Sequence, residues 1–118
     1  LPYVLDVNRK GSKKRLAELA RKTGMVKSGQ AGKSDSDIAD SLIAQVRELI
    51  ATLNIDPTVK NMQSSDFNDI AKAAAKEVSD TYAVPTYLSA AEIKDILTKI
   101  KQASDEHASR DAKTGKVA

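Results

Sequence analysis

Cysteine and tryptophan are both missing from this chain of 118 residues. Without cysteine it can form neither a disulfide nor a thiolate metal site, and no thiol can act as a nucleophile. This suits a reducing compartment, so we expect a cytoplasmic protein. Aromatic residues are also scarce, with one Phe and three Tyr, whereas Ala, Leu, Ile and Val supply most of the 41% apolar content. That balance predicts an all-α fold rather than an aromatic-rich sheet.

Long apolar runs are missing too. No stretch approaches the roughly 18 apolar residues that a membrane-spanning helix needs, and the first residues lack the layout of a signal peptide. We therefore expect a soluble protein that does not enter a membrane. The chain begins Leu1-Pro2-Tyr3 without an initiator Met, and we expect it to be a piece of something longer.

Positive charge is in slight excess, with a net charge of +3. Lys and Arg alternate with Asp and Glu along most of the sequence, which is typical of a solvated surface. The densest basic run is Arg9, Lys10, Lys13, Lys14 and Arg15. A free-standing helical interaction or nucleic-acid-binding module using residues 9–15 is therefore kept as the alternative function, although nucleic acid is not the expected partner.

Apolar spacing predicts a small bundle of about four helices, over residues 12–22, 35–53, 65–79 and 90–102. Beyond them the composition becomes polar, so the predicted organisation is a helical subdomain over 1–103 and a disordered or frayed tail over 104–118.

Two helix boundaries have clear chemical signals. Gly24 can adopt the left-handed conformation that closes the first helix, and Ser89 with Glu92 forms a capping box for the fourth. The second helix has cap candidates in residues 35–37 and ends at Asn54. One face of that helix is predicted to be buried: Ile38, Leu42, Val46, Leu49, Ile50 and Leu53.

Candidate chemical groups are few. His107 lies in the polar tail without a second ligand at metal-binding spacing, so we interpret it as a surface residue. Residues 29–34 end in Gly-Lys-Ser but lack the earlier Gly and the strand of a phosphate-binding loop. Tyr82, Pro85 and Tyr87 lie in an interhelical segment, where rings either plug the core or wall a pocket; packing is favoured.

Several segments match a known pattern in order and spacing. Residues 1–8 (Leu-Pro-Tyr-Val-Leu-Asp-Val-Asn) are similar to Leu-Pro-x-Val-x-x-Phe-Asn, with Val7 replacing Phe, and residues 16–20 to a helix containing Ala-Glu-Leu-Ala. Residues 53–59 are similar to Leu-Gly-Ile-Pro-x-x-Leu, and residues 84–93 to Asn-Pro-Arg-x-x-Thr-x-Glu-Asp-Ile. Over residues 1 to about 100 the chain thus resembles the C-terminal helical region of the iron-dependent (group III) alcohol dehydrogenases.

The resemblance implies a parent enzyme that shares the helical domain of the dehydroquinate synthase-like and iron alcohol dehydrogenase folds. In such a parent, Fe(II) on one Asp and three His polarises the alcohol oxygen while hydride passes to NAD or NADP. The ligands and the dinucleotide loop precede the segment seen here, so this chain alone is expected to be inactive, with no catalytic, cofactor-binding or metal residue. Its implied partner is the missing N-terminal dinucleotide-binding and metal-ligand part, and a homo-oligomer is left open.

The match has departures around the expected substrate cavity. Where the family often has Cys and then Asn-Pro-Arg, this chain has Asp80, Val84, Pro85 and Thr86. If any residues here meet substrate, the resemblance implies the segment of Asp80, Thr81 and Tyr82 as a pocket wall.

Overall fold

The computed structural model describes residues 1–26, 28–29, 32–56, 58–81 and 83–115, with only the backbone for 79–81. Within these residues the chain forms four α-helices and a short 3-10 helix, without any strand. The predicted all-α class is confirmed. No helix in the described part is long and apolar enough to cross a membrane.

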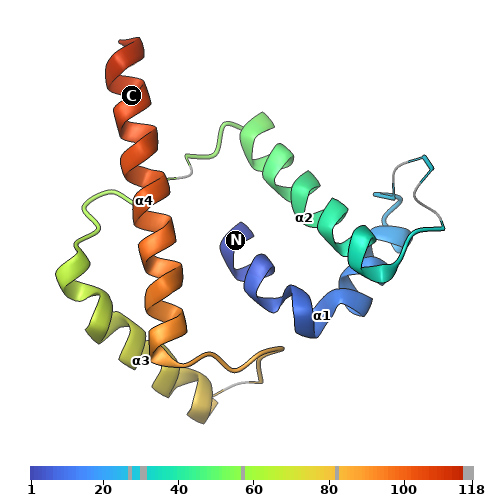
Figure 1. Ribbon diagram of the computed structural model, residues 1–118, viewed down its shortest axis with the longest axis horizontal. Helices are drawn as coiled ribbons and strands as arrows, with labels where there is room; N and C mark the ends of the chain where they lie inside the picture. The colour runs from blue at the N-terminus through green and yellow to red at the C-terminus, as the bar shows by residue number, and fades with distance from the viewer. Residues whose placement is uncertain (27, 30–31, 57, 82, 116–118) are drawn as a thin grey trace. The chain divides into compact units, whose positions relative to one another are not determined.

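The chain divides into two compact units, Leu1–Ile55 and Asp56–Ala118. Figure 1 shows helices α1 and α2 in the first unit and α3 and α4 in the second. This division differs from the predicted subdomain over 1–103, whose limits stay a prediction.

Helix α1 spans Pro2–Lys22, so it begins much earlier than the predicted helix at Ser12. Proline suits the first helical turn because its missing N–H would have no acceptor there. Ion pairs also hold this first half against α2, through Asp6 with Arg47 and Arg9 with Asp40. Neither tertiary pair is visible in the local apolar spacing, which explains why the sequence predicted a shorter helix.

Helix α2 spans Asp35–Thr52 and is capped by Ser34, one residue before the predicted candidates. The Ser34 hydroxyl accepts a hydrogen bond from the Asp37 N–H at 3.2 Å. Asp35 and Asp37 place negative charge at the positive end of the helix dipole.

The two helices of the first unit end in the same way. Gly24 has φ of 71° and Asn54 has φ of 51°, so each residue adopts the left-handed conformation just after its helix. The following N–H groups then return to the helix, from Met25 to the Ala20 carbonyl at 2.9 Å and from Ile55 to the Ile50 carbonyl at 3.1 Å. These are Schellman endings, and they confirm the predicted boundaries at Gly24 and Asn54.

The core of the first unit lies where α1 and α2 cross-pack. Its buried residues have exposed fractions of 4% or less: Ala17, Ala20, Ile38 and Leu42. Small alanines on α1 allow close approach of the branched side chains on α2. The Gln45 side chain on α2 donates a hydrogen bond to the Met25 carbonyl at 2.8 Å and so links α2 to the turn that follows α1.

Apolar side chains are left exposed at the other end of this unit. The predicted buried face of α2 is confirmed at Ile38 and Leu42 but is wrong at Leu49 and Leu53, which are 52% and 60% exposed. The Asp6–Arg47 pair brings the first turns of α1 beside the last turns of α2. We call the exposed set there the open end: Leu1, Val4, Leu49, Leu53 and Ile55.

The second unit begins with a turn at residues 60–61 and a 3-10 helix, η1, over Ser64–Asp66, which leads directly into α3 at Phe67–Thr81. Phe67 and Ala71 are buried against α4. Ile70, one residue before Ala71, is 45% exposed. The core of this unit is therefore small.

Helix α4 spans Ala90–Thr114 and begins with the predicted capping box, which the structure confirms. The Glu92 carboxylate accepts from the Ser89 N–H at 2.8 Å, while the Ser89 hydroxyl accepts from the Glu92 N–H at 3.3 Å. The bond from the Ser89 N–H is the main cause that lowers the pKa of Glu92.

Helix α4 continues through Thr114, where the composition predicted a frayed or disordered tail over 104–118; residues 116–118 lie outside the description. Ser104 is buried in this part of the helix, and its hydroxyl accepts from the Val59 N–H at 3.1 Å. Ion pairs four residues apart support the same stretch, namely Lys101–Asp105 and Glu106–Arg110, and His107 contacts Asp111 at the same spacing. The helix then ends at Gly115, which is left-handed with φ of 68°.

Candidate functional site

A groove in the second unit, between the start of α3 and the middle of α4, is the candidate site. Its volume is about 350 Å³, at the lower end of the range for small-ligand pockets. The lining residues are Ser64, Phe67, Lys94, Thr98, Lys101, Gln102 and Asp105.

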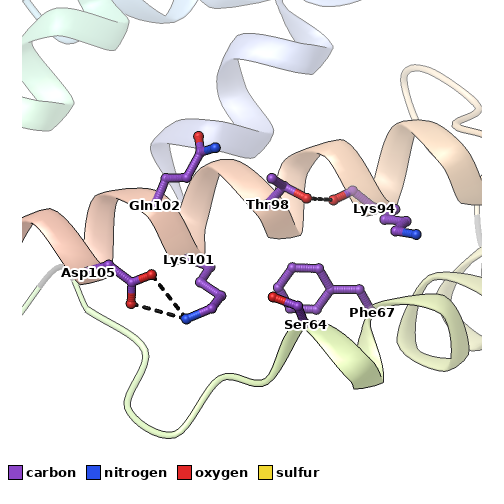
Figure 2. Close-up of a pocket in the computed structure, with 7 residues that line it drawn as sticks. All are labelled: Ser64, Phe67, Lys94, Thr98, Lys101, Gln102 and Asp105. Atoms are coloured by element: carbon purple, nitrogen blue, oxygen red, sulfur yellow. Dashed lines mark hydrogen bonds and ion pairs between the residues drawn. The ribbon is translucent and has the colours of Figure 1, made fainter.

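Helical geometry gathers most of these side chains. Lys94, Thr98, Lys101 and Asp105 are spaced by four, three and four residues, so they form one stripe along α4. Figure 2 shows Phe67, at the start of α3, and Ser64, in η1, extending toward this stripe, whereas Gln102 projects from the opposite side of α4.

Two lysine ammonium groups line the groove, those of Lys94 and Lys101, and among the described residues only that of Lys101 is paired with a carboxylate. The Lys101 ammonium lies 3.0 and 3.1 Å from the two carboxylate oxygens of Asp105. Thr98 uses its hydroxyl proton in a 2.9 Å bond to the Lys94 carbonyl. Among the described residues neither the Lys94 ammonium nor the Ser64 hydroxyl has a hydrogen-bond or ion-pair partner, and both residues are exposed to solvent.

Sequence reasoning did not select this groove. It predicted a helix over residues 90–102 and interpreted the mixed charges of the chain as a solvated surface. The regular spacing from Lys94 to Asp105 is the signal that was present in the sequence. However, only the fold places Phe67 and Ser64 opposite that stripe.

The predicted pocket-wall residues fall at the end of α3. Asp80 and Thr81 belong to its last turn, but their side chains lie outside the described part, as does all of Tyr82. Their role therefore stays a prediction. The expected packing of the neighbouring segment is wrong for Tyr87, which is 70% exposed, and Pro85 is exposed as well.

The basic run on α1 is divided by the fold. Arg9 pairs with Asp40 and donates to the Ser36 hydroxyl at 2.9 Å, and the hydrogen bond to Asp40 is the main cause that raises its pKa. Lys10, Lys13, Lys14 and Arg15 are exposed. Arg9 is therefore not a free cation for the alternative function, a binding module at residues 9–15. That alternative otherwise stays a prediction.

The remaining sequence candidates have structural roles where they are described. Ser34, which ends the Gly-Lys-Ser segment, caps α2, while Gln30 and Ala31 lie outside the described residues. The His107 side chain is 44% exposed, and its Nδ1 lies 3.0 Å from Asp111 Oδ2, which confirms it as a surface residue. Among the described residues no three His, Cys, Asp or Glu side chains gather in a way that could hold a metal ion.

These observations define the class: an α-helical protein whose described residues form two helix pairs, one in each unit. A family model described as the Fe-containing alcohol dehydrogenase family, C-terminal, matches residues 1–101. The chain therefore belongs to this family, as the segment pattern predicted. Searches of the curated proteins and of the solved structures gave no match.

Proposed function

We propose that this chain is the C-terminal helical scaffold of an iron-dependent, NAD(P)-linked alcohol dehydrogenase. The family match over residues 1–101 carries the proposal. The intact enzyme would interconvert an alcohol and an aldehyde by hydride transfer involving the nicotinamide. A chain without cysteine suits the reducing cytoplasm in which we place it.

The iron and the dinucleotide are assigned to other parts of the enzyme. The described side chains do not fit a metal site, because no suitable group of ligands gathers among them. We therefore derive no chemical step from residues of this chain. Its proposed contribution is to support the metal-binding part and, through Asp80, Thr81 and Tyr82, to wall the substrate cavity.

The open end of the first unit supports a scaffold role. Its five apolar side chains are each at least 50% exposed. Exposed apolar area at one end of a helix pair is favourable to cover, because contact with a partner removes it from water. We propose that the metal-binding helical part of the same enzyme covers this patch.

The first test is an activity assay of the purified chain with ferrous iron, an alcohol, and NAD or NADP. We expect no reduction of the nicotinamide above a metal-free control, whereas turnover by this chain alone would contradict the scaffold role. Sequencing of the encoding gene upstream of Leu1 should show a continuous frame that encodes a Gly-rich nucleotide loop and a His-rich metal segment.

The second test adds the remaining part of the enzyme, expressed separately, and measures restored activity. Leu49→Asp places a charge in the open end and should lower restored activity by at least about ten-fold, because an unpaired charge would be buried. Ala44→Asp introduces the same charge at an exposed position of α2 outside the open end and serves as the matched control. Equal losses in the two variants would contradict the proposed interface.

A further inference from the structure

We propose that α1 contains a hinge at Gly11 and Ser12, and that residues 2–10 form a helical arm which exposed ion pairs hold against α2. Salt screens these pairs, so a rise in ionic strength moves the arm away from α2 and takes the open end apart. The movement of the arm is a property of this chain alone. Its consequence for docking of the rest of the enzyme rests on the proposed function.

The middle of α1 has the features of a hinge. Figure 1 shows that α1 bends part-way along its length. Gly11 and Ser12 lie at the centre of Pro2–Lys22, and Gly/Ser pairs are among the few common causes of a sharp helix bend. Glycine also weakens a helix interior, because it loses more backbone freedom than alanine when the helix forms. The helix is therefore weakest where its two halves meet.

The two halves of α1 are attached to the unit in different ways. Ala17 and Ala20, both in the second half, are the only buried residues of α1, all of which the structure describes. In the arm Leu5 and Val7 are half-buried, and Val4 is 50% exposed. Apolar packing therefore fixes the second half more firmly than the arm, and polar contacts carry more of the attachment of the arm.

Two ion pairs connect the arm to α2, Asp6 with Arg47 and Arg9 with Asp40, and we call them the clamp. Their four side chains are between 37% and 49% exposed. Arg9 also donates to the Ser36 hydroxyl at 2.9 Å. Exposed ion pairs are weak and are screened by salt, so the clamp opens at an ionic strength that leaves the buried core intact.

The clamp also determines whether the open end is assembled. Leu1 and Val4 move with the arm, whereas Leu49, Leu53 and Ile55 stay with α2 and the residues that follow it. Screening acts on charges and has little direct effect on an apolar interface. Docking on the open end should nevertheless weaken as salt rises, because its two sides separate.

The experiment measures the distance between the arm and α2 in the full chain by dipolar EPR. Because the chain has no cysteine, Val4→Cys and Ala51→Cys supply two exposed positions for nitroxide labels. Labels at Arg15→Cys and Ala44→Cys, which are also exposed, connect the second half of α1 to α2 and serve as the matched control. Circular dichroism will verify that each labelled chain retains its helices.

The first pair of labels should move apart when sodium chloride rises from about 0.01 M to about 1 M, because the Debye length falls from about 30 Å to about 3 Å. Val4 lies about 10 Å along the helix from Gly11, so a rotation of about 30° lengthens the separation by about 5 Å. The control pair should keep its separation. An unchanged distance for the first pair would show that the clamp does not hold the arm.

Charge reversal tests the clamp. Asp6→Lys places two cations together and should give, at low salt, the long separation of the parent chain at high salt. Adding Arg47→Glu recreates a pair of opposite charges and should restore the short separation. Lys10→Gln removes an exposed charge that pairs with no described residue and should change nothing. Failure of the swapped pair to restore the distance, or an equal effect of Lys10→Gln, would contradict the ion pairs as the cause.

Gly11→Ala tests the hinge. Alanine strengthens the helix at this position and should reduce the lengthening with salt by at least about two-fold. An unchanged response in this variant would contradict a hinge at Gly11.

Restored activity with the separately expressed part of the enzyme tests the consequence for docking. It should fall in Asp6→Lys and recover when Arg47→Glu is added. Equal activity in both variants, with the expected EPR response, would contradict the effect of the arm on docking. If no variant restores activity while the EPR response is complete, the proposed function fails and the hinge stands.

Discussion

Helices α1 and α2 pack together through apolar side chains that recur at helical spacing. Helices α3 and α4 have a smaller apolar core, and a buried serine hydroxyl adds a polar contact to it. In the first unit Ile38 and Leu42 pack on the alanines of α1. In the second unit Phe67 and Ala71 are buried, and Ser104 joins α4 to a segment 45 residues earlier. The comparison shows that periodic burial can fix one helix pair while a single long-range polar contact helps to fix another.

The largest expected effect is on the core of the first unit. Ile38→Ala should reduce the free energy of unfolding of this unit by about 2–4 kcal/mol, because it leaves a cavity at a side chain only 1% exposed. Residue-resolved hydrogen exchange of α1 and α2 measures the loss without assuming that both units unfold together.

Leu49→Ala is the matched control on the same helix. Leu49 is 52% exposed, so its truncation should cost less than about 1 kcal/mol. A loss as large as that of Ile38→Ala would show that the open end is buried in the free chain, and the distinction between core and open end would fail.

The next effect tests the polar contact of the second unit. Ser104→Ala removes the acceptor of the Val59 N–H and should destabilise this unit by about 1–3 kcal/mol, because the partly buried donor is left unpaired. Exchange of the amides in residues 104–114 should accelerate, since this contact ties the second half of α4 to the preceding loop.

Ser109→Ala provides the control for loss of a helical serine. Ser109 makes the same type of bond to the carbonyl four residues earlier, at 2.8 Å, but it is exposed and bonds to no described residue outside α4. Its loss should change stability by less than about 0.5 kcal/mol. If both variants behave alike, the contact between Ser104 and Val59 does not stabilise the second unit.

The smallest effect concerns the start of α4 and depends on pH. Ser89→Ala should destabilise the helix start by about 1 kcal/mol near neutral pH. Glu92 has a lowered pKa in the folded chain, so its ionised form stabilises the fold above its ordinary, unfolded pKa of 4.5. That contribution is lost as the pH falls through the lower, folded-state value.

Circular dichroism and amide exchange of residues 90–93 between pH 7 and pH 3 will measure this loss. Glu92→Gln should remove the part of the acid response that arises at the helix start, while the core of the first unit retains its protection. An unchanged acid response in Glu92→Gln would contradict the role of the ionised carboxylate.

Local chemistry made several features of the fold predictable. The helix endings at Gly24 and Asn54 and the capping box at Ser89 depend on groups within a few residues, and the structure confirms all three. The second half of α4 was not predicted, because its polar composition resembles that of a disordered segment. This part of α4 is supported by charged pairs four residues apart and by the hydrogen bond from Val59. Amino-acid composition contains no information on either contact.

The candidate groove shows the same limit. The spacing from Lys94 to Asp105 predicts that these side chains share one stripe of α4. Many exposed helices have such stripes without binding a ligand, so the spacing alone does not predict a site. Apolar spacing likewise placed Leu49 and Leu53 on the buried face of α2, although both are exposed, because a periodic pattern does not show how far the neighbouring helix extends.

The sequence by itself determined the helical class, the helix endings at Gly24 and Asn54, the capping box at Ser89 and the family, because each is encoded in local chemistry or in the order of short segments. Only the tertiary structure decided which apolar residues are covered and where α4 ends. It alone placed Phe67 opposite Lys94, since these outcomes depend on contacts between residues that are far apart in the chain.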